Sequence, residues 1–178
     1  MPISKLSIKL DAMRIIGVDP GTHRLGFGVI DVDGLQVSYV DSGCLSAPRK
    51  APIEIRLNLL HHELKAIVSN LKPNHLAIEE PFVAPTRGAK SAIAVGQAQA
   101  LALIIAAEHK LNVYRYAPAA VKASASGYGA STKSQVQRVI RILLSLGPDP
   151  MSEDESDALA VGLCHIQHLR TFGKIGKS

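Results

Sequence analysis

Hydrophobic and polar positions in the first quarter of the chain follow the pattern of β-strands. Residues 14–19 form a short β-rich run that stops at Pro20-Gly21, and residues 25–32 and 35–45 flank the dipeptide Asp33-Gly34. Pro-Gly is a turn signal, and Asp-Gly favours a two-residue type I′ hairpin. The pattern therefore predicts a meander of three antiparallel strands.

The middle of the chain introduces the period of an α-helix. Apolar residues over residues 53–67 recur at helical spacing and predict an amphipathic helix that ends before Lys72-Pro73. Residues 75–79 and 112–116 are predicted strands, and an alanine-rich helix over residues 89–110 separates them.

The last third of the chain is predicted to be a loop followed by two helices. Residues 123–131 are small and predict a flexible loop, and Thr132 then opens a helix with a capping-box pattern to Gln135. A last helix starts at Ser152 and runs to about Arg170. The order of elements predicts an α/β fold of the ribonuclease-H-like kind, a mixed five-stranded sheet flanked by helices.

Length and composition limit the chain to one domain. Its 178 residues, 47% of them hydrophobic, suffice for one compact domain and not for two. We expect this domain to cover residues 13–170, with a flexible extension over residues 1–12 and a short tail over residues 171–178. Met13 stands directly before the first predicted strand, so it is also a candidate natural start.

Charge and cysteine content narrow the function classes. The net charge of +5 and the pI near 9.3 favour a polyanionic partner. Cys44 and Cys164 lie far apart without metal-ligand spacing, so a disulfide framework is not expected and the reducing cytoplasm is the predicted location. The longest apolar stretch, residues 100–107, is far shorter than the roughly 20 residues of a membrane span.

Four acidic residues are placed where they can converge at one edge of the sheet. Asp19 ends the first strand and Glu79 the fourth, while Asp154 and Asp157 lie three residues apart at the start of the last helix. Carboxylate oxygens suit Mg2+ or Mn2+. Two such ions, about 3.5–4 Å apart, clamp an in-line phosphodiester displacement, and four carboxylates balance their charge.

Each acid also has a purely structural interpretation. Asp19 before Pro-Gly fits an Asx turn, and Glu80 matches the strand-end pattern as well as Glu79 does. Asp154 lies in a first helical turn, where acids favour the helix dipole. Asp157 is harder to explain in this way because it leads directly into an apolar run, where an unpaired acid is costly.

Basic and aromatic residues accompany the acids. Lys122 and Lys133 bracket the small-residue loop, and Lys133 begins a helix, where free N–H groups attract phosphate. Arg138 continues along the polar side of that helix, which is also the pattern of a solvated face. Phe82 and Arg87 belong to a predicted loop beyond Glu79; the ring suits stacking on an unpaired base, or a place in the core.

Five short motifs together resemble the RuvC family of bacterial Holliday-junction resolvases. In this sequence they are GVDPGT at residues 17–22, AIE at 77–79, AVK at 120–122, KSQV at 133–136 and DESDALA at 154–160. The resemblance covers residues 13–168 in unbroken order.

The resemblance implies a ribonuclease-H-like endodeoxyribonuclease of homologous recombination and DNA repair. Such an enzyme would act as a homodimer on four-way DNA junctions and make paired, symmetric nicks. Two Mg2+ or Mn2+ ions per site would be held by four acids, and the resemblance selects Glu79 over Glu80. The four are Asp19, Glu79, Asp154 and Asp157.

The resemblance also assigns the residues around the acids. Lys122 and Lys133 match basic residues near the scissile phosphate, and Phe82 matches an aromatic at the opened centre of the junction. The helix over residues 89–110 matches the dimer interface of the family, in agreement with Gly96 on its stripe of small residues. The implied partners are the branch-migration proteins RuvA and RuvB.

Three other functions are compatible with parts of the sequence. Another ribonuclease-H-like nuclease, cutting RNA in hybrids or trimming DNA ends, would need the same acids. The Asp19-Pro20-Gly21-Thr22 loop is similar to the phosphate loop of actin-like proteins, but that fold needs two domains and a second phosphate motif. A junction-binding protein without activity is disfavoured by the presence of all four acids.

Overall fold

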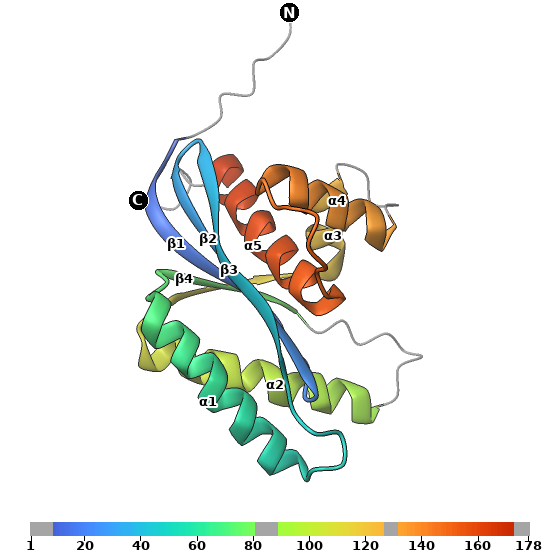
Figure 1. Ribbon diagram of the computed structural model, residues 1–178. Coiled ribbons are helices and arrows are strands. Elements are labelled where there is room, and N and C mark those ends of the chain that lie inside the picture. The colour runs from blue at the N-terminus through green and yellow to red at the C-terminus, as the bar shows by residue number, and fades with distance from the viewer. Residues whose placement is uncertain (1–8, 81–88, 127–131, 173–178) are drawn as a thin grey trace, which may run out of the picture.

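A five-stranded sheet with helices on both faces forms the protein (Figure 1). The computed structural model describes residues 9–80, 89–126 and 132–172. In chain order, the elements are β1 (Leu10–Asp19), β2 (Arg24–Gly34), β3 (Gln36–Ser46), α1 (Ile53–Leu71), β4 (His75–Glu79), α2 (Ala89–Glu108), β5 (Asn112–Tyr116), α3 (Pro118–Ser126), α4 (Lys133–Leu143) and α5 (Glu153–Phe172). The predicted ribonuclease-H-like mixed sheet is confirmed.

The strands lie in the order β3-β2-β1-β4-β5. β1 pairs antiparallel with β2, and β2 with β3, whereas β1–β4 and β4–β5 are parallel. Because β1 and β4 are parallel neighbours, their carboxyl ends meet at the same edge of the sheet. This edge carries the residues at which β1 and β4 end, Asp19 and Glu79.

The alternation of side chains along the strands separates two cores. On β1, Ile16 and Val18 pack against α1 and α2 in one apolar cluster, while Ile15 belongs to a second cluster with α3, α4 and α5. β4 divides its residues in the same way, with Leu76 and Ile78 in the first cluster and Ala77 in the second. A period of two therefore puts Asp19 and Glu79 on the face that α5 covers.

Two glycines let the backbone of α5 approach the sheet on that face. A Cβ atom at Gly17 would lie 2.1 Å from the carbonyl oxygen of Ala158, and one at Gly26 would lie 1.9 Å from that of Asp154. Any side chain at either position would displace the helix. The position of the first turns of α5 is therefore fixed by the sequence of β1 and β2.

The hairpin between β2 and β3 differs from the predicted turn. Asp33 pairs with Gln36, so the two loop residues are Gly34 and Leu35 rather than Asp33 and Gly34. Gly34 has a φ of 60°, and Leu35 is not among the described residues with positive φ. This pattern fits a type II′ turn, which needs glycine only at its first central position, and not the predicted type I′ turn.

Other predicted boundaries need correction. β1 begins at Leu10, inside the predicted extension over residues 1–12, because Leu10 pairs with Gly34 and packs against the second core. The pairing with β2 is irregular between Leu10 and Met13, and the alternation of hydrophobic and polar residues is interrupted there. The pattern therefore did not predict this part of the strand. α5 continues to Phe172, two residues past the predicted end of the domain.

The predicted loop over residues 123–131 is wrong in its first part. α3 runs from Pro118 to Ser126 and buries Val121 against the second core. Proline suits the first position of a helix, but the alanine and serine residues that follow give no apolar period for a pattern to detect. Residues 127–131 lie outside the described residues.

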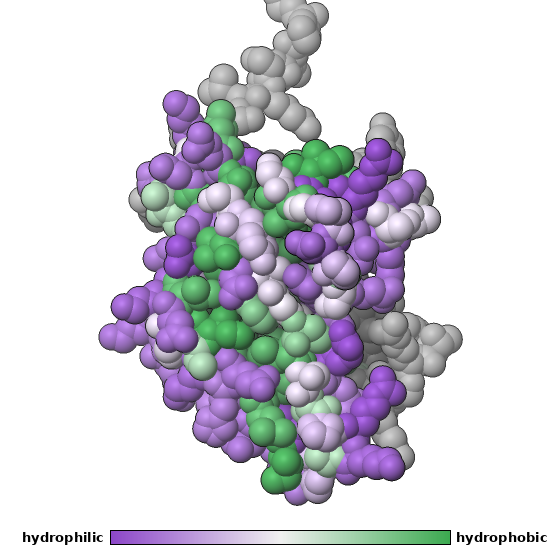
Figure 2. Space-filling model, in the orientation of Figure 1, coloured by the Kyte–Doolittle hydropathy of each residue, from purple (hydrophilic) through white to green (hydrophobic). Residues whose placement is uncertain are grey.

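The remaining elements agree with their predictions. α1, β4 and β5 end where expected, and Thr132 and Gln135 form the predicted capping box at α4. Within the described part of the chain, no helix has the length and apolar character to cross a membrane. Patches of hydrophobic residues interrupt the hydrophilic surface on the face shown in Figure 2.

Candidate active site

Three of the predicted acids are electrostatically coupled at the edge of the sheet. Burial, followed by the charges of Asp157, Glu79 and Asp154, raises the pKa of Asp19 to about 7. Burial and the charge of Asp157 also raise the pKa of Glu79, and burial raises that of Asp157. Carboxylates that repel one another in a partly buried place gain from a nearby cation.

The structure distinguishes Glu79 from its neighbour in the sequence. Glu79 lies on the α5 face and is partly buried, whereas Glu80 is exposed. The backbone N–H of Glu80 donates a hydrogen bond to the carbonyl oxygen of Tyr116 at 2.8 Å, so the chain continues the pairing with β5 at this point. The two glutamates that the strand pattern left equivalent thus differ in their surroundings.

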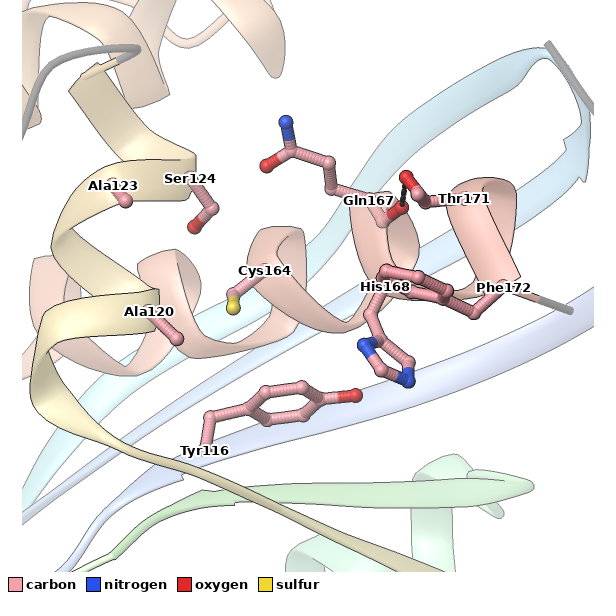
Figure 3. A pocket seen from close by; sticks show the side chains of 9 residues that line it. All are labelled: Tyr116, Ala120, Ala123, Ser124, Cys164, Gln167, His168, Thr171 and Phe172. Carbon is pink, nitrogen blue, oxygen red and sulfur yellow. Dashed lines mark hydrogen bonds between the residues drawn. The ribbon is translucent and has the colours of Figure 1, made fainter. Parts of the chain in front are cut away.

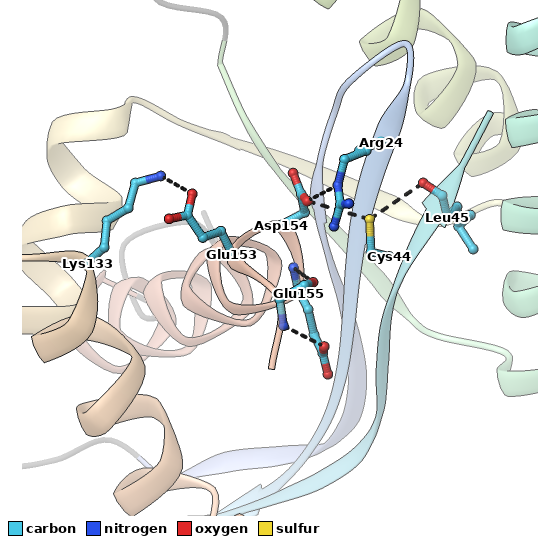
Figure 4. Close-up of polar contacts among 8 residues, drawn as sticks. Arg24, Cys44, Leu45, Lys133, Glu153, Asp154 and Glu155 are labelled. Carbon is cyan, nitrogen blue, oxygen red and sulfur yellow. Dashed lines mark hydrogen bonds and ion pairs between the residues drawn. The ribbon is translucent and has the colours of Figure 1, made fainter. Parts of the chain in front are cut away.

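Lys122 and Lys133 lie close enough to the acids to act on their ionisation. The positive charge of Lys133 lowers the pKa of both Asp19 and Asp157, and that of Lys122 lowers the pKa of Glu79. Lys133 also forms an exposed ion pair with Glu153, with 2.6 Å between Nζ and Oε2 (Figure 4). Both lysines therefore border the acid site, one from α3 and one from α4.

Asp154 contacts two residues that the sequence analysis did not select. Arg24 Nε donates a hydrogen bond to Asp154 Oδ2 over 2.5 Å, and Cys44 Sγ lies 3.6 Å from the same oxygen (Figure 4). Burial raises the pKa of the Cys44 thiol, which keeps its proton available for donation. The N-terminus of α5 is therefore joined to the strand ends of β2 and β3.

A second contact fixes the same helix end. Ser42 on β3 donates a hydrogen bond to Glu155 Oε1 over 2.6 Å. Glu155 also closes a capping box with Ser152, with 3.2 Å from Glu155 N to Ser152 Oγ and 3.3 Å from Ser152 N to Glu155 Oε2. Adjacent residues of α5 are thus tied to two adjacent strands.

The donor set fits divalent cations in its chemistry. Asp19, Glu79, Asp154 and Asp157 supply only carboxylate oxygens, which Mg2+ and Mn2+ prefer. In the described ranges, no three side chains of His, Cys, Asp or Glu lie together at metal-binding spacing. The acids are therefore near enough to raise one another's pKa, but their oxygens are farther apart than the ligands of one bound metal ion.

The predicted DNA-contacting residues fall in different places. Phe82 and Arg87 lie outside the described residues. Arg138 is exposed on α4, where its side chain makes no hydrogen bond or ion pair with a described residue. Its role in binding DNA stays a prediction.

A separate pocket of about 310 Å3 lies between β5, α3 and α5. Cys164 is found there between Tyr116 and Ser124 (Figure 3). None of the four predicted acids lines this pocket, so it is distinct from the acid site.

A hydrogen-bonded network of aromatic side chains is buried, wholly or in part, on the face of the sheet that α5 covers. Tyr116 Oη is 2.7 Å from His165 Nδ1, and His75 Nδ1 is 2.9 Å from His165 Nε2. Burial lowers the pKa of His165 to about 3, with smaller contributions from His75 and His168. The network links β4, β5 and α5. Because its members lie far apart in the sequence, no local pattern predicted it.

Comparison with known proteins identifies the family. The family model of the crossover junction endodeoxyribonuclease RuvC matches residues 15–165. The chain belongs to the RuvC family. It is 42% identical over 163 residues to the RuvC of Dehalococcoides mccartyi strain 195, with coverage of 92% of this chain and 97% of that protein. It is 39% identical over 166 residues to the RuvC of Chloroflexus aggregans, with coverage of 93% and 100%.

Solved structures agree with this assignment. The Thermus thermophilus RuvC structure described as a complex with a Holliday junction substrate has a TM-score of 0.82 and 30% identity, with coverage of 89% of this chain and 95% of that one. The yeast mitochondrial resolvase Ydc2 shares the fold, with a TM-score of 0.60, 12% identity, and coverage of 92% of this chain and 86% of that one. The RuvC resemblance drawn from the five sequence motifs is confirmed.

Proposed function

We propose that this chain is a metal-dependent endonuclease that resolves four-way DNA junctions by paired, symmetric nicks. The observation that carries the proposal is the coupled group of Asp19, Glu79 and Asp157, with Asp154 beside it, on a RuvC-family fold. The net charge of +5 suits a DNA substrate. The place of this activity is homologous recombination and DNA repair in the cytoplasm, with RuvA and RuvB as partners.

The four carboxylates are the proposed ligands of two Mg2+ or Mn2+ ions. When bound, such ions supply activation of water and stabilisation of the leaving oxygen in phosphodiester hydrolysis. The raised pKa of Asp19, Glu79 and Asp157 supports this role, because nearby positive charge favours the ionised form of each acid.

Lys122 and Lys133 are the proposed contacts of the scissile phosphate. Both act on the ionisation of the acids, and Lys133 stands at the N-terminus of α4, where backbone N–H groups also attract phosphate. A phosphate bound here would compete with Glu153 for Lys133. Phe82, Arg87 and Arg138 are proposed as further DNA contacts.

A homodimer is the proposed active form, with α2 at its interface. Ile93 and Ile104 on this helix are exposed by 61% and 55%, and a Cβ atom at Gly96 would meet nothing within 4 Å. An apolar helix face with an open glycine supports close packing against a second copy of the chain. Two copies would provide two sites for symmetric cleavage.

Cleavage of synthetic DNA tests the proposal. The purified protein is incubated with Mg2+ or Mn2+ and a four-way junction, a linear duplex or an RNA–DNA hybrid, and the products are mapped on both strands. We expect paired nicks in the junction alone. Asp19→Asn should lower the cleavage rate by roughly 1000-fold or more, because a required carboxylate charge is lost, while junction binding is retained.

The other outcomes of this experiment decide against the proposal. Cutting of the hybrid would assign a different ribonuclease-H-like nuclease activity. Tight junction binding without cutting in either metal would assign a binding protein. Equal loss of binding and cleavage in Asp19→Asn would contradict the role given to Asp19.

A further inference from the structure

The two oxygens of Asp154 have different surroundings. Oδ2 accepts the hydrogen bond from Arg24 Nε at 2.5 Å and has Cys44 Sγ 3.6 Å away. Among the described residues, none makes a hydrogen bond to Oδ1. Cys44 Sγ is also 3.6 Å from the carbonyl oxygen of Leu45, so the single thiol proton is shared between two acceptors. Arg24 is therefore the stronger hydrogen-bond donor to Asp154.

The strands bring Arg24 and Cys44 to the helix by their register. Arg24 is the first residue of β2, and it lies on the same face as Gly26, two residues later. Gly26 pairs with Cys44 across the β2–β3 ladder, so the side chain of Cys44 points to that face as well. The face is the one that α5 covers.

The backbone at Asp154 has little freedom to move. Its carbonyl oxygen lies against Gly26, and the next residue, Glu155, is bound to Ser42 on β3. The side-chain torsions of Asp154 are therefore the main freedom left to its carboxylate. Arg24 restricts these torsions by holding one of the two oxygens.

The same carboxylate also lies near the acid site, because the backbone of Asp154 is against Gly26, which pairs with Asp19. The charge of Asp154 raises the pKa of Asp19 and of Asp157, so Asp154 is near both. A carboxylate held through one oxygen at this place has the other oxygen available as a single-atom ligand.

We infer that Arg24, assisted by Cys44, is a positioning residue that holds Oδ2 of Asp154 and presents Oδ1 to a divalent cation. This inference rests on the proposed metal-dependent function. Hydrogen-bonding partners of metal-binding carboxylates commonly contribute 10- to 100-fold to metal affinity. The opposite effect, competition between Arg24 and the cation for Asp154, would make the affinity of an Arg24 variant higher.

Titration of the DNA-free protein with Mn2+ by calorimetry separates these effects. We expect Arg24→Ala to weaken binding at one of two sites by about 10-fold or more. Arg24→Lys, which keeps the charge and a donor, should recover part of the loss, and Cys44→Ala should have a smaller effect. In an Asp154→Asn background, Arg24→Ala should change the affinity no further.

Arg49→Ala is the matched control. Arg49 is close enough to act on His23, next to Arg24 in the sequence, and it forms no ion pair with an acid in the described residues. Loss of its positive charge should leave Mn2+ affinity unchanged or slightly higher. Circular dichroism of each variant without metal confirms that the fold is kept.

The results distinguish failure of the inference from failure of the proposed function. Unchanged or tighter Mn2+ binding by Arg24→Ala, with normal binding by the unmodified chain, would overturn the positioning role alone. An equal effect of Arg24→Ala with and without Asp154 would also overturn it. Absence of Mn2+ binding by the unmodified chain would contradict the metal site itself.

Discussion

The helices pack against the two faces of the sheet in different ways. On the face of α1 and α2, large aliphatic side chains such as Leu60, Leu64 and Ile105 fill the space, and all three are fully buried. On the face of α5, glycines at positions 17 and 26 bring the helix backbone against the strands. The second face also buries His165 within hydrogen bonds and carries the acids at its edge.

This difference indicates a division of roles. The first face contributes stability through apolar burial, and its side chains can change with an effect mainly on the free energy of unfolding. The second face fixes the position of α5, and with it Asp154 and Asp157. Substitutions that move the start of α5 should affect cleavage more than stability. The following predictions test this division in order of decreasing effect.

Among substitutions that leave the four acids in place, Gly26→Val should produce the largest change in activity. A Cβ atom at this position would lie 1.9 Å from the carbonyl oxygen of Asp154, so the first turn of α5 must shift. A displacement of about 1 Å at a catalytic group can lower the rate by roughly 100-fold. Junction-cleavage rates under single-turnover conditions measure it.

Gly147→Ala is the control for this substitution. A Cβ atom there would meet only Asp149 Oδ2 at 3.9 Å, so the cleavage rate should not change. If Gly26→Val cleaved as fast as the unmodified protein, the close contact would have no part in positioning Asp154.

Leu64→Ala should affect stability and leave the chemistry unchanged. Leu64 is fully buried in the first core, and such a truncation costs about 2–5 kcal/mol of unfolding free energy. Urea denaturation measures the loss, and cleavage is assayed where the variant remains folded. Leu59→Ala, at an exposed position on the same helix, should change stability by no more than about 0.5 kcal/mol. A slower cleavage step in folded Leu64→Ala would show that the two faces are not independent.

The buried histidine of the second face should make stability depend on pH. Burial lowers the pKa of His165 from 6.5 to about 3 in the folded protein. Below pH 6.5 the unfolded chain takes up a proton that the folded chain does not, so unfolding becomes easier as the pH falls toward 3. The loss from this residue is about 2 kcal/mol between pH 6.5 and 4.5.

A difference measurement isolates this contribution. The free energy of unfolding is followed across this pH range for the unmodified protein and for His165→Gln, which keeps hydrogen-bonding groups for Tyr116 and His75. The variant should lose less stability on acidification. Parallel curves for the two proteins would remove His165 as the cause.

Lys133→Ala should have the smallest of these effects, which is a weaker and less salt-dependent binding of DNA. One phosphate contact fewer should reduce the slope of log affinity against log salt concentration by about 0.9. Fluorescence anisotropy of a labelled junction at several salt concentrations measures this slope. An unaltered slope would show that Lys133 does not contact a phosphate of the junction.

Local patterns were sufficient for the elements with a clear period or cap. The helix α1, the strands β4 and β5, and the capping box at Thr132 follow from apolar spacing and hydrogen-bonding residues that lie next to one another in the chain. Local patterns did not predict α3, whose alanine and serine residues have no apolar period. They also missed the start of β1, where an irregular pairing interrupts the alternation of hydrophobic and polar residues.

The candidate site shows the same division between local and distant information. Asp19, Glu79, Asp154 and Asp157 were recognised in the sequence because strand ends and a helix start are local features and because the motifs around them resemble a family. The choice between Glu79 and Glu80 came from the resemblance and not from spacing. The structure adds that Glu79 is partly buried on the α5 face whereas Glu80 is exposed.

The sequence alone determined the type of every element except α3, the nature of the donor groups and the family. Only the tertiary structure decided which groups meet: Arg24 is 130 residues from Asp154 in the chain, and His75 is 90 residues from His165. Such contacts depend on strand register and on the seating of α5 against Gly17 and Gly26. Period and composition describe neighbours along the chain, whereas register and close approach are set by the packing of segments far apart in it.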